Sequence, residues 1–154
     1  MAVKASSRLI EIADALPLHR GMRVLEIGCG PGVLARLIAE RLKGDVFVLG
    51  IDRSAAAIAA AVAQIAESAY PTALAFRQSA AEHFTLADCE ALFDLAVAIR
   101  VGALDGRHPD AGRLAFPGIR AALVPGGRLF IDGGDPLREL SLNPGQDPRA
   151  EKPY

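Results

Sequence analysis

Three glycines, a glutamate and an aspartate are the residues of this chain whose types and spacing point most directly to chemistry. Gly28, Gly30 and Gly32 lie in the stretch VLEIGCGPG, where they follow a short apolar run that contains Glu26. Missing β-carbons let backbone N–H groups approach a ligand closely, and a helix after such a loop points its N-terminus at the same place. The stretch therefore favours a bound carboxylate or phosphate, although it also fits a tight turn between a strand and a helix without a ligand.

The aspartate is placed where a nucleoside site needs an acid. Asp52 ends a second apolar run, about 20 residues past the loop, and a carboxylate there can accept hydrogen bonds from ribose hydroxyls. The alternative is that Asp52 caps the helix that begins near Ser54. Glu26 stands two residues before Gly28 and would repel a pyrophosphate, so it suits a ligand with cationic groups.

Residues 99–110 hold the candidates for a reacting or substrate-binding group. Arg100 follows a strongly apolar run and could hold an anionic substrate or a cofactor carboxylate, with a surface salt bridge as the alternative. His108 is the histidine of this region and could act as a base, with a place at a helix entry before Pro109 as the alternative. The chain has two cysteines and no CxxC motif, so no metal site is predicted.

Alternating strands and helices must position these residues. Apolar periodicity predicts helices over 6–16, 33–42, 54–65 and 109–123, and Pro117 is expected to kink or split the last of them. Short apolar runs predict strands over 24–27, 46–51, 74–77, 92–99 and 128–132, with a turn at Pro125-Gly126-Gly127 before the fifth. Strands that are apolar nearly end to end indicate a parallel sheet covered on both faces, so we predict a doubly wound α/β fold.

Composition limits the partners and the setting. The chain has 154 residues, is 51% hydrophobic and carries a net charge of −1, so we expect one domain and neither nucleic acid nor an anionic membrane as partner. No apolar run is long enough to span a bilayer. Cys29 and Cys89 form no disulfide framework, which fits a reducing, cytoplasmic location.

The stretch VLEIGCGPG closely resembles motif I of class I S-adenosylmethionine-dependent methyltransferases. Four later segments resemble family motifs in the family order: GID at 50–52, SAAEHF at 79–84, FDLAVAIRVGAL at 93–104 and LVPGGRLFIDG at 123–133. The resemblance covers roughly residues 8–133. It implies a Rossmann-like fold and S-adenosyl-L-methionine as the cofactor.

The resemblance also implies a role for each matching position. Glu26 and the backbone of the glycine loop would hold the aminocarboxypropyl arm, Asp52 would hold the ribose, and Arg53 would lie against the adenine. Ala81 would bond the adenine through its backbone, with Glu82 nearby. The acid that usually binds the adenine amino group falls at position 80, which is Ala80 here, so Glu82 substitutes for it or the adenine is held less specifically.

Three functions remain open at this point. The resemblance implies a methyltransferase, and the lack of a basic excess favours a small-molecule acceptor. The alternative is an S-adenosylmethionine-binding module, or a degenerate domain that needs a partner. A nicotinamide-dependent oxidoreductase is a distant alternative, because Val33 stands where the dinucleotide motif has glycine or alanine.

The end of the sheet carries a prediction of its own. We expect residues 1–133 to form the cofactor-binding domain, truncated after the fifth strand, and residues 134–154 to form a proline-rich tail. The fifth strand would then be an apolar edge that recruits another strand. Residues 137–142 could fold back antiparallel against it, or a second copy could pair there and give a homodimer with two-fold symmetry.

Overall fold

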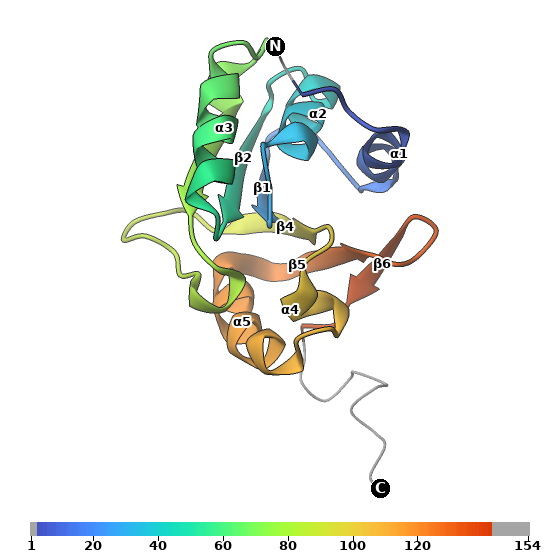
Figure 1. Ribbon diagram of the computed structural model, residues 1–154, viewed down its shortest axis with the longest axis vertical. Coiled ribbons are helices and arrows are strands. Elements are labelled where there is room, and N and C mark those ends of the chain that lie inside the picture. The colour runs from blue at the N-terminus through green and yellow to red at the C-terminus, as the bar shows by residue number, and fades with distance from the viewer. Residues whose placement is uncertain (1–2, 143–154) are drawn as a thin grey trace, which may run out of the picture.

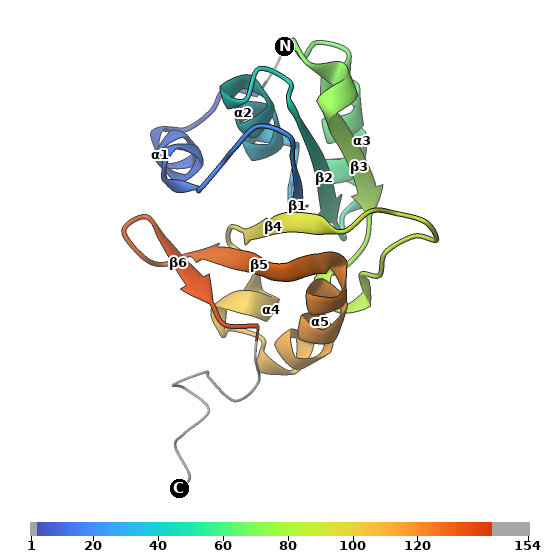
Figure 2. The same cartoon turned by 180° about the vertical axis from the view of Figure 1, so that it is seen from behind.

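A single mixed sheet lies at the centre of the computed structural model, which describes residues 3–142 (Figures 1 and 2). Its strand order is β3-β2-β1-β4-β5-β6, in which β1 to β5 run parallel and β6 runs antiparallel to β5. The strands are β1 (Met22–Ile27), β2 (Val46–Asp52), β3 (Leu74–Gln78), β4 (Phe93–Ala98), β5 (Leu123–Asp132) and β6 (Leu137–Leu140).

Helices cover both faces of this sheet. Figures 1 and 2 show α1, α2 and α3 on one side and α4 and α5 on the other. The helices are α1 (Ser7–Ala15), α2 (Val33–Arg41), α3 (Ala55–Ile65), α4 (Gly102–Asp105) and α5 (Pro109–Ala122), with 3₁₀ turns η1 (Pro71–Ala73) and η2 (Ala81–His83). Within residues 3–142, no helix has the length and apolar character needed to cross a membrane.

Side-chain caps fix the starts of two of these helices. The Ser6 hydroxyl accepts a hydrogen bond from the Leu9 N–H at 3.3 Å, and the Ser54 hydroxyl accepts one from the Ala57 N–H at 3.2 Å. Each bond satisfies one of the backbone donors that a helix N-terminus leaves unpaired. Helix α2 lacks such a cap, because its N-cap residue is Gly32.

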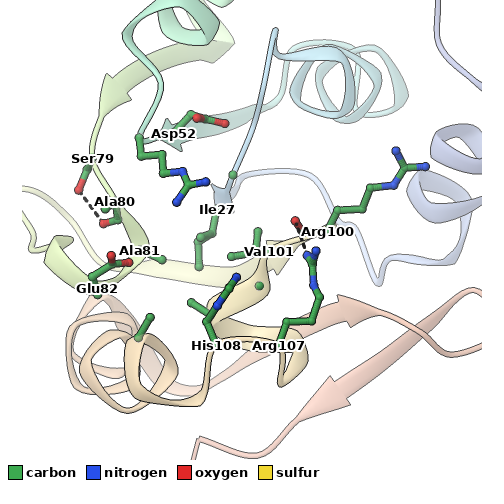
Figure 3. Close-up of a pocket in the computed structure, with 15 residues that line it drawn as sticks. Ile27, Asp52, Ser79, Ala80, Ala81, Glu82, Arg100, Val101, Arg107 and His108 are labelled. Carbon is green, nitrogen blue, oxygen red and sulfur yellow. Dashed lines mark hydrogen bonds between the residues drawn. The ribbon is translucent and has the colours of Figure 1, made fainter.

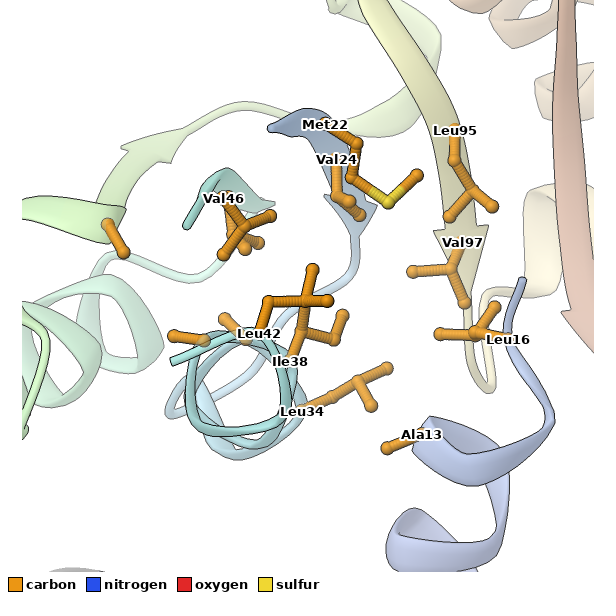
Figure 4. Packing of buried hydrophobic residues seen from close by; sticks show 14 of the residues in the cluster. Ala13, Leu16, Met22, Val24, Leu34, Ile38, Leu42, Val46, Leu95 and Val97 are labelled. Carbon is orange, nitrogen blue, oxygen red and sulfur yellow. The ribbon is translucent and has the colours of Figure 1, made fainter. Parts of the chain in front are cut away.

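The alternation of side chains along β1 divides the core into two layers. Val24 belongs to the layer against α1 and α2, where it packs with residues such as Leu34 and Ile38 (Figure 4). Leu25 belongs to the opposite layer, which includes Ile119 of α5. Both layers are buried, and this is why the strands read as apolar nearly end to end.

The predicted doubly wound, mostly parallel fold is confirmed, but the predicted truncation after the fifth strand is wrong. Leu137–Leu140 form β6, which pairs with β5 from Leu129↔Leu140 to Asp132↔Leu137. The prediction that residues after 133 fold back antiparallel is therefore confirmed. Because β6 pairs with residues 129–132 of β5, that part of the edge is not open to the second copy that was the alternative, and the homodimer itself stays a prediction. The rest of the predicted tail, residues 143–154, lies outside the described residues.

Two local predictions also need correction. The predicted turn at Pro125-Gly126-Gly127 lies inside β5, where the pairing with β4 shifts between Phe93↔Leu123 and Leu95↔Arg128. The β5 residues between these two pairs therefore form an irregularity within β5, and they do not form a turn that precedes the strand. Pro117 does not split the last helix, because α5 continues through it.

Candidate functional site

A cavity of about 380 Å³ opens at the carboxyl ends of β1, β2 and β4 (Figure 3). In a doubly wound sheet this edge is the usual place for a ligand. The lining comes from the loops after four parallel strands and from α5: Ile27, Gly28, Asp52, Arg53, Ser79, Ala80, Ala81, Glu82, Arg100, Val101, Gly102, Ala103, Arg107, His108 and Ala111. Seven of the ten predicted site residues line the cavity, and the other three, Glu26, Gly30 and Gly32, do not.

The glycine loop needs glycine for its backbone shape and for close packing. Gly28, Gly30 and Gly32 all have positive φ, at 70°, 53° and 82°. A Cβ on Gly28 would lie 2.6 Å from Val101 Cγ2, and one on Gly32 would lie 2.7 Å from Phe76 Cζ. Gly28 and Gly32 therefore lack room for a side chain because neighbouring residues pack closely against them, whether or not the loop also binds a ligand.

Asp52 ties the glycine loop to the start of α3. Its Oδ2 accepts a hydrogen bond from the Gly30 N–H at 2.9 Å, and its Oδ1 accepts one from the Ser54 N–H at 2.9 Å. The two roles weighed from the sequence are thus compatible, because an ionised carboxylate offers about four acceptor positions and two are used here. Asp52 also lines the cavity, where further acceptor capacity is available to a ligand.

Among residues 3–142, Glu26 is the only polar or charged residue that is buried, and 4% of its surface is exposed. The Ala35 N–H, in the first turn of α2, hydrogen-bonds its carboxyl group and so replaces the cap that Gly32 cannot supply. Its Oε2 atom has no partner among the described residues. Burial, opposed by the Ala35 bond and assisted by the nearby Asp52 charge, raises the pKa of Glu26 to about 8. A cation beside Oε2 would lower that pKa again.

This raised pKa predicts that the stability of the free protein falls as the pH rises. Between its ordinary pKa of 4.5 and about 8, Glu26 holds its proton in the folded chain and loses it in the unfolded chain. The free energy of unfolding therefore decreases over that interval and levels off above it. Urea unfolding at pH 5.5, 7 and 8.5 measures the slope, which Glu26→Gln is expected to flatten. An equal slope in both proteins would contradict the assignment.

The residues after β4 form a second, cationic wall. Arg100 has a positive φ of 58°; its N–H donates to Asp132 Oδ1 at 3.0 Å, and its carbonyl accepts from Arg107 Nη2 at 3.2 Å. Arg107 also pairs with Asp105 at 2.8 Å, and Asp132 lies 3.6 Å from Arg8. The salt bridge weighed for the Arg100 side chain is not found among residues 3–142.

His108 lies at the entry to α5, which was the alternative to a role as a base, and it also faces the cavity. It is the N-cap residue of α5, and its N–H donates to the Gly102 carbonyl at 2.9 Å. Figure 3 shows its ring directed into the cavity, where it packs against Gly102. No described residue hydrogen-bonds the ring, so none orients it as a base.

The sequence reasoning missed two residues of this wall, Arg107 and Asp132. Asp132 ends β5 just as Asp52 ends β2, so its position at the same sheet edge could have been noticed. Arg107 gave no signal, because its role depends on the turn that α4 makes before Gly106. Within the described part of the chain, no group of three or more His, Cys, Asp or Glu side chains could hold a metal ion.

Comparisons with known proteins all point to methyltransferases. The family model described as "Methyltransferase domain" matches residues 18–150. An O-methyltransferase of Aspergillus nomiae is 35% identical over 88% of this chain, and a trans-aconitate 2-methyltransferase of Delftia acidovorans is 31% identical over 85%. The chain spans 60% and 45% of the lengths of these two relatives.

A solved structure gives the same answer for the fold. The S-adenosylmethionine-dependent methyltransferase of Geobacter sulfurreducens, in complex with S-adenosyl-L-homocysteine, superposes with a TM-score of 0.65 and 23% identity. The match covers 82% of this chain and 47% of that one.

Proposed function

This chain belongs to the family of class I S-adenosylmethionine-dependent methyltransferases, and on that premise we propose that it transfers a methyl group from S-adenosylmethionine to a small molecule. The cofactor would supply a methyl group activated on a positively charged sulfur. The relatives named above support the proposal, because one is an O-methyltransferase and the other is a trans-aconitate 2-methyltransferase, whose named acceptor is a small molecule. The free thiols of Cys29 and Cys89 support the proposal of a reducing, cytoplasmic setting.

The observation that carries the proposal is the unpartnered Oε2 atom of buried Glu26. A buried acceptor without a partner is costly, and an ammonium group is the partner that would both fill the hydrogen bond and favour the carboxylate. The aminocarboxypropyl arm of the cofactor carries such an ammonium. Gly28, Gly30 and Gly32 would hold the rest of that arm through their backbone.

The other cavity residues fit the adenosine part. Asp52 keeps acceptor capacity for the ribose hydroxyls while it holds the glycine loop. Arg53 would lie against the adenine, and the backbone of Ala81 would bond it, with Glu82 nearby on the same wall. Arg100 and His108 stand on the opposite side, where the acceptor would approach. These residues bind and orient, which is the main requirement for an in-line displacement.

Binding of S-adenosylhomocysteine is expected to release close to one proton at pH 7. The pKa of Glu26 is about 8 in the free protein, and the ligand ammonium would ionise it. Titration calorimetry in two buffers of different ionisation enthalpy measures the release. Glu26→Gln with the same ligand, and the wild type with 5′-methylthioadenosine, which lacks the ammonium, are expected to release none.

Two results would count against this function. Tight binding of NAD with no response to either sulfur nucleoside would favour the oxidoreductase alternative. Binding of S-adenosylhomocysteine without transfer of label from S-adenosylmethionine to a small-molecule extract or to RNA would favour the binding-module alternative. Labelled RNA with an unlabelled extract would contradict the small-molecule acceptor.

A further inference from the structure

We propose that the acceptor is a small carboxylate and that the Arg100 guanidinium binds it; this inference rests on the proposed methyl transfer. Charge is divided across the cavity. The wall assigned to adenosine carries the carboxylates Asp52 and Glu82 and one cation, Arg53, whereas the wall after β4 carries the cations Arg100 and Arg107 and the ring of His108. An anionic group is therefore more favourable at the second wall than at the first.

The side-chain pairings single out Arg100 on that wall. Arg107 is already engaged, because it pairs with Asp105 and donates to the Arg100 carbonyl. The two carboxylates nearest to this wall are engaged as well: Asp105 by Arg107, and Asp132 by Arg8 and the Arg100 N–H. The Arg100 guanidinium is left without a carboxylate partner among the described residues. A guanidinium presents a planar fork of donors that matches a carboxylate in two parallel hydrogen bonds.

The backbone of Arg100 is held so that this side chain keeps its place. A residue with a β-carbon rarely adopts a φ of 58°, and here the peptide is secured from both sides by Asp132 and Arg107. Figure 3 shows the side chain extending from the end of β4 away from Ala81, Glu82 and His108, so that its guanidinium lies outside the cluster of labelled lining residues. The guanidinium is thus presented away from the adenosine wall, where a second molecule can reach it.

The chemistry of the wall points to an acceptor that needs no base. The His108 ring has no orienting partner, and Asp105 and Asp132 are held by arginines, so no side chain there is set up to remove a proton. A carboxylate is already ionised near neutral pH. Its oxygen forms a bond to the methyl carbon as the bond from that carbon to sulfur breaks, and the electron pair stays on sulfur. The products are a methyl ester and a neutral thioether, and no proton moves.

The chemical stability of the labelled product tests the acceptor class without knowledge of its identity. The full chain is incubated with methyl-labelled S-adenosylmethionine and a small-molecule extract, and the products are then treated with alkali. Methyl esters hydrolyse and release volatile labelled methanol, whereas N-methyl groups and ethers keep the label. We expect most of the label to be released, and label retained in alkali-stable products would overturn the proposal.

Variants at position 100 test the residue. Arg100→Gln is expected to lower the rate of methyl-ester formation about 10- to 150-fold, the range for the loss of hydrogen bonds to a charged group. Arg100→Lys is expected to recover part of the rate. Arg113→Gln is the matched control, because that arginine is exposed on α5, pairs with Asp110 and does not line the cavity; its rate should equal that of the wild type.

Ligand binding separates this inference from the proposed function. Arg100→Gln is expected to leave the Kd values of S-adenosylhomocysteine and 5′-methylthioadenosine within about twofold of wild type. A tenfold or larger loss for S-adenosylhomocysteine alone would show that Arg100 binds the carboxylate of the cofactor, and would overturn the proposal. If the wild type bound neither nucleoside, the proposed function itself would fail.

Discussion

An Asp52→Ala variant is expected to bind S-adenosylhomocysteine about 10- to 150-fold more weakly, a loss of about 1.5–3 kcal/mol. The carboxylate holds the Gly30 N–H of the loop and the Ser54 N–H of α3, and under the proposed function it also accepts ribose hydroxyls. Its removal therefore loosens the loop and removes ligand contacts at the same time. Titration calorimetry gives the Kd, and the melting temperature reports the loss of the two backbone bonds.

A modified ligand separates these two effects. An analogue of S-adenosylhomocysteine without the ribose 2′-hydroxyl should lose affinity for the wild type and much less affinity for Asp52→Ala, because the partner of that hydroxyl is already gone. The difference between the two losses is the coupling energy of a double-mutant cycle. Equal losses in both proteins would mean that Asp52 shapes the loop without touching the ribose.

Alanine at either glycine of α5 is expected to destabilise the fold by about 1–3 kcal/mol. A Cβ on Gly112 would collide with the carbonyl oxygen of Ala103, and one on Gly118 with that of Phe84. Both neighbours are backbone atoms, which cannot move aside by changing a rotamer. For a chain of this size the melting temperature should fall by about 2–4 °C per kcal/mol.

The sign of the effect makes this test decisive. In a helix without such contacts, replacing glycine by alanine stabilises by about 0.5–1 kcal/mol. A higher melting temperature for Gly112→Ala or Gly118→Ala would therefore show that the close approach does not limit the packing. Arg113→Ala on the exposed side of the same helix is the control and should change stability by less than about 0.5 kcal/mol.

The parallel part of the sheet was predictable because burial on both faces leaves a simple pattern. Strands such as Val46–Asp52 are almost wholly apolar, and β1, β2 and β4 are each followed by a helix. The end of the sheet was harder to predict, because β6 is short and carries Arg138 and Glu139. The irregularity in β5 was predicted as a turn, because Pro125-Gly126-Gly127 has the composition of a turn. Only the register between β4 and β5 shows that these residues lie within the strand.

In the candidate site, too, some residues could be placed from the sequence and others could not. Gly28 and Asp52 could be placed from the sequence, because each depends on its position at the end of a strand. The burial of Glu26 and the clamp on Arg100 could not, since both depend on contacts between distant segments: Ala35 in α2, and Asp132 at the end of β5. The sequence shows which residues are present but not which carboxylates are already occupied.

Strand β6 also changes what the sheet presents to other molecules. Without it, the ten residues of β5 would offer a long row of unpaired N–H and C=O groups, a template on which extended chains aggregate. With it, residues 129–132 of β5 are paired. The outermost strand has four residues, among them Arg138 and Glu139, and Arg128 reaches across to Glu139 at 2.8 Å. A short, charged border is a poor template for another strand, so this hairpin protects the protein against edge-to-edge aggregation at the end of the sheet.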